Sequence, residues 1–550
     1  TDTLLLTATC QGVHGVRGAL ANSVFGVEKD RLHVVAHDVG GGFGAKNFAY
    51  PEQALLLWAA KRLGRPVKWI ATRNETLIAD HQARDHEATA RLALDADGRF
   101  LALEIDSVAN LGGYIAGSAA GVQTNQYAHV PGTVYRIPAF ALRVRAALTN
   151  TTPVGVLRGP GFAEMNNVVE RLVERAAAVS GIDRFELRRR NLLRPAAMPS
   201  ANPHGGAIDS GDFPRAFERA LELADVAGFA DRRAANPLPL GIAAACHIKA
   251  TGGNPDENVE IRFRADGGVD LVTGTQTIGQ GHETTFPQML ADRLGVPNGL
   301  IRLVQGDTDA IPFGGGHGSS RATYMGGTAI FRAAAMVVEK GTPIAAELLQ
   351  AKPEQTTFQD GRFRAGGREA GLLDVAAEAM RRGNPLDSYY FWTREAMTYP
   401  SGTHVAEVEV DPETGVVRLV RYTAVDDYGV VVNPMVATGQ VHGAIAQGVG
   451  QALLEAMVFD PADGQPLTGS FMDYAMPRAD DLPSFAVEFS PTRCTTNPVG
   501  VKGCGEAGAI AGYPAVSLAI LDALKLYGVE GWQGPASANA IWQALQTAKD

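Results

Sequence analysis

A single carboxylate, Glu506, stands among glycines, small residues and one thiol in the stretch VKGCGEAGAI, residues 501–510. Glycine lets backbone or ligand approach a neighbouring side chain closely, so the pattern predicts an acid that faces something bound. General acid–base catalysis is the chemistry open to such a carboxylate. The alternative is a helix cap or turn ahead of the apolar run YPAVSLAILDAL.

Glycine-rich loops recur along the chain, which holds 63 glycines in 550 residues. Each loop exposes backbone N–H groups, and several precede an expected helix, where the unpaired donors and the helix dipole favour an anion. One such loop is explained by a tight turn, but five favour a large polyanionic cofactor held mainly by backbone. The loops are DVGGGFGAK, VLRGPGFAEMNN, TIGQGHETTF, GGGHGSSRATYMGG and VKGCGEAGAIAGYP.

Other motif-based functions lack a required residue. GGGFGAK fits neither G-x-G-x-x-G nor the P-loop pattern, and no acidic residue ends an obvious next strand. His282-Glu283 has no second histidine to complete H-E-x-x-H, and G-x-S-x-G does not occur. Cys504 has no histidine nearby in the sequence to activate it. A net charge of -10 without a basic run disfavours nucleic acid as a partner.

Cysteine content and hydropathy predict the compartment. The four cysteines form no CxxC pair and no spacing suited to zinc or an iron–sulfur cluster, so any electron relay must sit on another chain. Few cysteines and no disulfide framework fit a reducing, cytoplasmic location. We found no apolar run of about 18 residues and no signal-peptide pattern, so we expect a soluble chain with no membrane span.

Hydrophobic periodicity predicts an α+β fold. Strand-like segments are expected at 31–39, 66–72, 86–112 and 139–150, with DADG as a hairpin turn, and helices at 51–64 and 166–181. The second half contains two further hairpins, at 258–275 and 403–427. A polar stretch near DRRAANPLP places a boundary between domains 1–232 and 233–550.

Seven blocks, in order, resemble the molybdenum-binding large subunit of the xanthine oxidase family of molybdenum hydroxylases, in the branch with carbon monoxide, aldehyde and N-heteroaromatic dehydrogenases. The resemblance implies two elongated α+β domains with a molybdopterin cofactor buried between them. In bacteria this is commonly molybdopterin cytosine dinucleotide, carrying molybdenum with oxo and sulfido ligands and no direct protein ligand to the metal. The blocks are DVGGGFGAK, GRPVKWIATRNE, LRGPGFAEMNNVVERLVERAA, GTQTIGQGHETTFPQMLADRLG, GSSRATYMGG, DDYGVVVNPMVATGQVHGAIAQGVGQAL and VGVKGCGEAGAIAGYPAVSLAILDAL.

The resemblance assigns roles residue by residue. Glu506 matches the family's catalytic glutamate, which removes a proton from the hydroxyl on molybdenum before that oxygen attacks an electron-poor carbon. The remaining matches are cofactor contacts near the metal, the pterin or the phosphates: Gly41, Gly42, Phe43, Gly44, Arg158, Gly159, Gln280, Ser319, Ser320, Arg321, Ala322, Gln440 and Gly505.

Departures from the family's residue pattern narrow the range of expected substrates. Carbon monoxide dehydrogenases place a copper-binding cysteine where this chain has Gly159, which disfavours carbon monoxide. Xanthine-type enzymes place a glutamate and a phenylalanine where this chain has Asn47 and Pro160, which disfavours purines. With Gln126 these two residues are the candidate substrate pocket. N-heteroaromatics, such as nicotine-like or nicotinate-like rings, are preferred over aldehydes, although no residue here is diagnostic of either.

The resemblance also implies partners. Electrons would pass to 2Fe-2S clusters and FAD on smaller subunits. Family large subunits begin well before this chain's first block, so we expect either a subunit split between two polypeptides, with a separate chain supplying the missing segment, or a fragment. A non-catalytic cofactor-carrying scaffold, and a hydrolase without a cofactor, are the alternatives from other functional classes.

Overall fold

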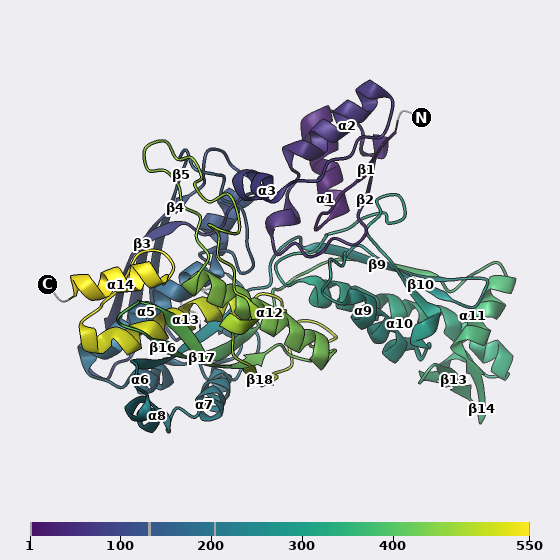
Figure 1. Cartoon of the computed structure of the whole chain (residues 1–550). Coiled ribbons are helices and arrows are strands. Elements are labelled where there is room, and N and C mark those ends of the chain that lie inside the picture. Colours follow the sequence, from purple (N-terminus) through teal and green to yellow (C-terminus); the bar gives the residue numbers. More distant parts are fainter. Residues whose placement is uncertain (1–2, 130–133, 203–204, 549–550) are drawn as a thin grey trace. The chain divides into compact units, whose positions relative to one another are not determined.

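The computed structural model describes residues 3–129, 134–202 and 205–548. Helices and strands are mixed throughout, which confirms the α+β class (Figure 1). The chain divides into two compact units built from alternating segments: unit 1 is 1–69, 252–397 and 496–501, and unit 2 is 70–251, 398–495 and 502–550. The linear division at residue 233 stays a prediction. That boundary falls inside unit 2, because the units exchange segments several times.

Unit 1 contains three small sheets. A parallel pair joins β1 (Leu4–Thr7) to β2 (Leu32–Val35). The largest sheet has the order β11-β10-β9-β15, and the third is the antiparallel meander β12-β13-β14. Their bounds are β9 Asp256–Phe263, β10 Val269–Thr273, β11 Ile301–Val304, β12 Thr357–Gln359, β13 Arg362–Ala365, β14 Arg368–Gly371 and β15 Ser388–Thr393.

The helices of unit 1 cover these sheets. The long helix α10 packs against β9 and β15 and also against α9, and α2 packs on β1. The bounds are α1 Val13–Gly18, α2 Pro51–Leu63, α9 His282–Leu294, α10 Ala322–Leu349 and α11 Leu372–Arg381.

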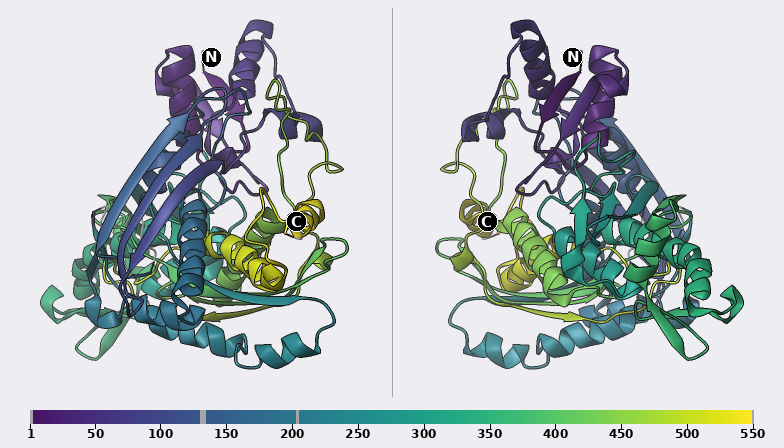
Figure 2. Two further views of the ribbon diagram at one scale, coloured as in Figure 1. Left: turned by 90° about the vertical axis from the view of Figure 1, so that its left-hand side faces the viewer. Right: turned by 90° about the vertical axis from the view of Figure 1, so that its right-hand side faces the viewer.

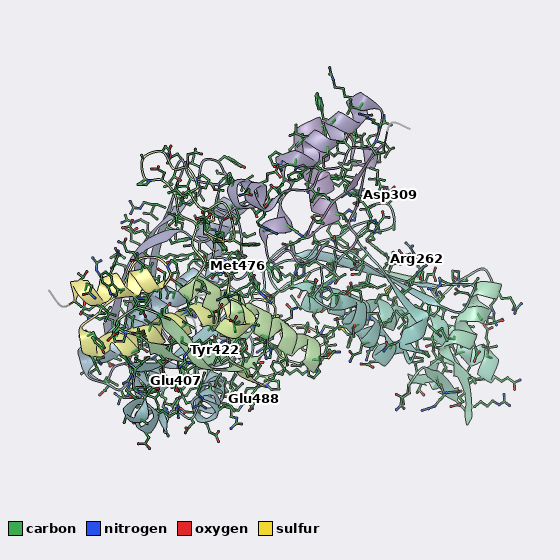
Figure 3. All side chains as sticks on the ribbon, viewed as in Figure 1. Arg262, Asp309, Glu407, Tyr422, Met476 and Glu488 are labelled. Atoms are coloured by element: carbon green, nitrogen blue, oxygen red, sulfur yellow. The ribbon has the colours of Figure 1, made fainter. Side chains whose placement is uncertain are left out.

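Unit 2 is organised around a four-stranded sheet of order β18-β17-β16-β8 (β8 Leu240–Ile248, β16 Ser401–Val410, β17 Val417–Asp427, β18 Phe485–Phe489). Helices lie on both of its faces (Figure 1). The helices α12 (Pro434–Leu453) and α13 (Ala507–Leu524) cover one face, and α7 (Phe213–Leu223) contacts β16 and β17. Tyr422, labelled in Figure 3, is 1% exposed in this core.

A second sheet of unit 2, β3-β4-β5, packs through β3 on α5. Figure 2 shows its three long strands as one layer. The bounds are β3 His86–Leu94, β4 Phe100–Asn110, β5 Ala139–Ala147 and α5 Phe162–Ser180. The remaining elements of unit 2 are α3 Arg73–Ala79, α4 Ala119–Gly121, α6 Arg184–Asn191, β6 Ser200–Ala201, β7 Ala207–Ile208, α8 Phe229–Ala235 and α14 Ala538–Thr547.

Most expected elements are present, with one exception. The two hairpins of the second half are β9–β10 and β16–β17, and the DADG turn joins β3 to β4. The strand expected at 66–72 is wrong: these residues form no strand, and Trp69 and Ile70 are 44% and 73% exposed. Alternation of side chains is not enough, because a strand needs a neighbour for its backbone hydrogen bonds.

The expectation that no apolar run is long enough to cross a membrane is wrong for helix α13. Among the described residues, Ala507–Tyr527 is long and apolar enough to cross a membrane, but 83% of its apolar window is buried inside the fold. The helix contacts β8, β16 and α12. Its apolar composition is therefore explained by its packing as a helix in the protein core.

Glycines allow α12 and α13 to approach closely. A Cβ atom added to Gly508 would lie 2.7 Å from the Ile445 backbone nitrogen, whereas one added to Gly439 meets nothing within 4 Å. We therefore expect Gly508→Ala to destabilise the protein by about 1–3 kcal/mol through overpacking. Gly439→Ala should be neutral or stabilising by up to about 1 kcal/mol, since alanine favours a helix.

Denaturant unfolding of the two variants beside the parent protein tests this expectation. Equal stability of Gly508→Ala and the parent would show that the two helices can separate without cost.

Candidate active site

The carboxylate of Glu506 is held by two donors within unit 2. Glu506 is 8% exposed and occupies the N-cap position of α13, but its side chain makes no capping hydrogen bond. Its Oε1 accepts a hydrogen bond from the Gly159 backbone N–H at 2.9 Å, and its Oε2 lies 2.9 Å from the Lys249 ammonium. The Glu506 side chain therefore does not act as a helix cap.

Lys249 is a buried cation that the sequence reading missed. It follows β8 directly, is 1% exposed, donates from Nζ to the Ala250 carbonyl at 3.0 Å, and lies 5.1 Å from the centroid of the Phe162 ring. An ammonium at this distance stabilises an ionised carboxylate. The signal in the sequence is a lysine at the end of the mostly apolar strand segment LGIAAACHIK, in which His247 is the other ionisable side chain apart from a cysteine.

Gly159 is suited to its position by its missing side chain. Its φ of +80° is a conformation that favours glycine, and an added Cβ would lie 2.8 Å from Ile510 Cγ1. The neighbouring Gly161, at φ +78°, is the N-cap residue of α5. The loop thereby presents a backbone N–H to Glu506 instead of a side chain.

Arg158 ties the second glycine loop to two other segments of unit 2. Its Nε donates to the Gly505 carbonyl, and its Nη2 donates to the Gln440 carbonyl at 3.0 Å and to Gln440 Oε1 at 3.1 Å. Burial lowers the pKa of Arg158 to about 10, against the opposing effect of the Glu506 carboxylate. The guanidinium is still charged at neutral pH, so it fixes the loop beside Glu506.

The thiol beside the acid is not a thiolate. Burial raises the pKa of Cys504 to about 11, although the Arg158 guanidinium acts in the opposite direction. None of the four cysteines, all of which are among the described residues, forms a disulfide. Because thiolate is the nucleophile and the metal ligand, Cys504 is unsuited to both roles at neutral pH.

The candidate substrate residues fall in different units. Gln126 and Pro160 belong to unit 2, and Asn47 belongs to unit 1. A Cβ added to Gly161 would lie 3.0 Å from the Gln126 carbonyl carbon, so Gln126 is adjacent to the second loop. The buried Gln126 Oε1 has no hydrogen-bond partner among the described residues. A bound polar group would satisfy it.

In unit 1 three glycine loops meet around Gln11, which the sequence reading also missed. Gln11 Oε1 accepts from the Gly44 N–H at 2.7 Å, and its Nε2 donates to the His317 carbonyl at 3.2 Å. Gln280 Nε2 lies 2.8 Å from His317 Nδ1, and the Gly41 N–H donates to the Ile278 carbonyl at 2.9 Å. The contacts join the loops at 40–46, 276–281 and 314–321.

The loop before α10 has an unusual backbone. Ser319 and Ser320 adopt φ values of +52° and +55°, a region that non-glycine residues rarely occupy outside ligand sites and tight turns. Ala322 is the first residue of α10. The Arg321 guanidinium points into unit 1, where it donates to Glu257 Oε2 at 2.9 Å, so its side chain stabilises the loop internally.

The predicted site residues thus form one cluster in each unit. Unit 2 brings together Glu506, Gly505, Arg158, Gly159 and Gln440. Unit 1 carries the other cofactor residues, namely Gly41, Gly42, Phe43, Gly44, Gln280, Ser319, Ser320, Arg321 and Ala322.

Comparison with known proteins identifies the family. Two models described as molybdopterin cofactor-binding domains match residues 1–192 and 219–483. The gamma subunit of the 6-hydroxypseudooxynicotine dehydrogenase complex from Paenarthrobacter nicotinovorans is 34% identical over 99% of this chain and 70% of its own length. This chain belongs to the molybdenum-binding large subunits of the xanthine oxidase family.

Two other comparisons describe where this molybdenum hydroxylase subunit lies in the family. The large subunit of nicotine 6-hydroxylase from the same organism is 32% identical over 99% of this chain and 70% of its own length. Quinoline 2-oxidoreductase from Pseudomonas putida 86 matches with a TM-score of 0.93 and 31% identity over 99% of this chain and 72% of that one. The subunit is a molybdopterin-dependent oxidoreductase, which removes the hydrolase alternative.

The residues of both units fit a molybdopterin cofactor. The left-handed Ser319 and Ser320 lead into the N-terminus of α10, and Gly281, at φ +83°, is the N-cap residue of α9. Helix N-termini of this kind offer unpaired N–H groups to anionic phosphate. In unit 2 the buried Gln126 Oε1, which has no hydrogen-bond partner among the described residues, is open to a bound polar group.

Proposed function

We propose that this chain is the catalytic subunit of a dehydrogenase that hydroxylates an electron-poor ring carbon of an N-heteroaromatic compound. The balanced reaction is ring C–H plus water to ring C–OH, two protons and two electrons. Two features support the substrate class: relatives named for nicotine and quinoline, and a second loop without a thiol. When bound, the molybdenum cofactor would accept the two electrons and supply the water-derived oxygen.

The observation that carries the proposal is the environment of Glu506. A buried carboxylate with one N–H donor on Oε1 and one ammonium on Oε2 is held ionised in a fixed orientation. An ionised carboxylate accepts a proton, so Glu506 acts as general base toward the attacking oxygen. Lys249 is the positioning residue that keeps the base charged, and Gly159 orients it.

The other residues position the cofactor and the ring. Arg158 and Gln440 hold the second loop, and the loops of unit 1 would bind the pterin and phosphates of the cytosine dinucleotide form through backbone N–H groups. Gln126, Pro160 and Asn47 are the proposed substrate contacts. Smaller subunits carrying 2Fe-2S clusters and FAD would take the electrons, in a cytoplasmic complex.

Carbon monoxide and aldehydes are the competing substrates. A carbon monoxide dehydrogenase large chain from Hydrogenophaga pseudoflava is 30% identical over 98% of this chain and 70% of its own length. A side chain at position 159 would collide with Ile510, so this loop does not accommodate a metal-binding cysteine there. No observation on the described residues favours aldehydes.

Metal analysis and a substrate panel test the proposal on the native complex. We expect molybdenum near one atom per chain, release of CMP on hydrolysis, and dye reduction with N-heteroaromatics but not with aldehydes or carbon monoxide. Turnover of aldehydes alone would show that the substrates are aldehydes and not N-heteroaromatics. A fully matured complex without molybdenum and without turnover would support the scaffold alternative.

A further inference from the structure

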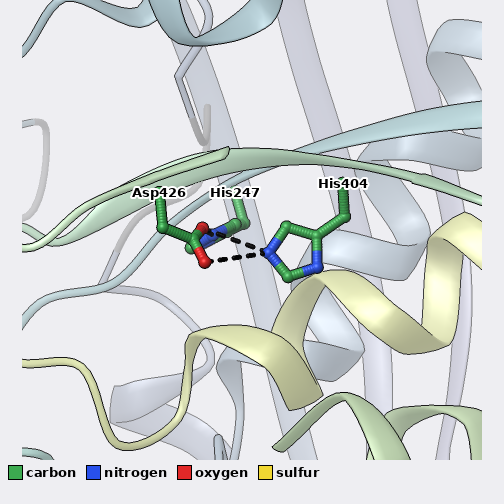
Figure 4. Close-up of side chains that lie close together, drawn as sticks. All are labelled: His247, His404 and Asp426. Carbon is green, nitrogen blue, oxygen red and sulfur yellow. Dashed lines mark hydrogen bonds and ion pairs between the residues drawn. The ribbon is translucent and has the colours of Figure 1, made fainter. Parts of the chain in front are cut away.

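Three buried ligand atoms converge in the sheet of unit 2, on residues to which the proposed function assigns no role. His247 on β8, His404 on β16 and Asp426 on β17 are all fully buried (Figure 4). The His247 Nε2 lies 3.0 Å from Asp426 Oδ1, and the His404 Nε2 lies 3.1 Å from the same oxygen. One ligand atom from each residue lies within 4.8 Å of the other two.

The strand register explains why the side chains meet. Gly402 on the central strand β16 pairs with Asp426 on one side and with His247 on the other, and His404 is two residues further along the same strand. A Cβ added to Gly402 would lie 2.0 Å from Asp426 Oδ1. The missing side chain therefore leaves room for the Asp426 carboxylate, and the strand register places His247 and His404 on the same face of the sheet.

Two tyrosine hydroxyls surround the cluster. Tyr422 Oη lies 2.8 Å from His404 Nδ1, and Tyr428 donates to Asp426 Oδ2 at 2.7 Å. Metal-binding histidines usually place their second ring nitrogen against such a partner, which fixes the ring orientation. The His247 Nδ1 is buried and has no partner among the described residues.

The charges around the cluster favour a cation. The adjacent Asp427 has its own ammonium, because Lys502 Nζ lies 2.8 Å from Asp427 Oδ2. The Asp426 carboxylate contacts the two imidazoles and the Tyr428 hydroxyl. A buried carboxylate is stable only when a positive charge or a metal ion compensates it.

We propose that His247, His404 and Asp426 form a binding site for a divalent zinc ion that joins three strands of unit 2. Two imidazoles and one carboxylate suit zinc, because imidazole disfavours calcium and magnesium. Each imidazole nitrogen lies 3.0 or 3.1 Å from Asp426 Oδ1, and the three ligand atoms lie within 4.8 Å of one another. They are close enough for side chains that shift slightly to share a metal held at about 2.0–2.1 Å from each. Helix α13, which begins after Glu506, packs on β8 and β16, so the ion would stabilise the layer beneath it.

Zinc analysis and X-ray absorption of the native complex test this site without any substitution. We expect about one zinc per chain after dialysis against metal-free buffer, with nitrogen and oxygen ligands at about 2.0–2.1 Å, imidazole scattering and no sulfur. Absence of zinc, or zinc with sulfur ligands, would overturn the proposal. The cluster would then be a histidine–carboxylate hydrogen-bond network compensated by a proton.

Variants locate the ion. We expect His404→Gln and Asp426→Asn to lower bound zinc at least tenfold, while Asp480→Asn, at a side chain 81% exposed, retains it. Zinc retained by His404→Gln would overturn the site. If these variants fail to assemble, the X-ray absorption spectrum of the parent complex decides whether zinc has the ligands of the proposed site. Molybdenum content and turnover are measured separately, so failure of this site leaves the proposed function untouched.

Discussion

Glu506→Gln is expected to lower kcat by about 10²- to 10⁴-fold, which is the range for loss of a general base. Glutamine keeps the size and the acceptor oxygen for the Gly159 N–H, but it cannot take a proton. Steady-state dye reduction by the native complex measures the effect. Molybdenum and CMP content should be unchanged, because no cofactor contact is removed.

Glu530→Gln is the matched control for this prediction. Its side chain is 79% exposed and pairs with the exposed Arg175, so we expect turnover within about twofold of the parent enzyme. Turnover by Glu506→Gln at the parent rate would exclude the general-base role, and would leave Glu506 as a residue that only fixes the second loop.

Lys249→Met is expected to shift the pH dependence of turnover to higher pH. The ammonium 2.9 Å from Glu506 Oε2 favours the charged base, so its removal leaves the buried carboxylate protonated until higher pH. The acid limb of kcat against pH should therefore move upward by about 1–3 pH units. At neutral pH the rate should fall, and it should recover as the pH rises.

Two variants separate electrostatics from folding in this experiment. Lys525→Met, at an exposed lysine, should leave the profile unchanged. In Lys249→Met/Glu506→Gln both charges are gone, so the added loss over Glu506→Gln alone should be small, because coupled residues are not additive. A uniform rate loss at every pH would instead assign Lys249 a purely structural role.

Much of the unit 2 site could be predicted from sequence because it lies in short motifs. Glycine next to Glu506 and in the Arg158–Gly159 loop is a local property, and so is the helix that follows each loop. The alternation of residues predicted the β3–β4 and β16–β17 hairpins correctly. The segment at 66–72 failed, because a strand depends on a neighbour that its own sequence does not specify.

The sequence by itself determined the α+β class, the family and the acid that stands alone among small residues, since each depends on residues close together in the chain. Only the tertiary structure decided that Lys249, 257 residues before Glu506, is its counter-ion, and that Gln11 joins the loops of unit 1. It also brought His247, His404 and Asp426 together beside Gly402. The physical reason is that strand register and helix packing choose partners across long sequence separations, which local patterns do not encode.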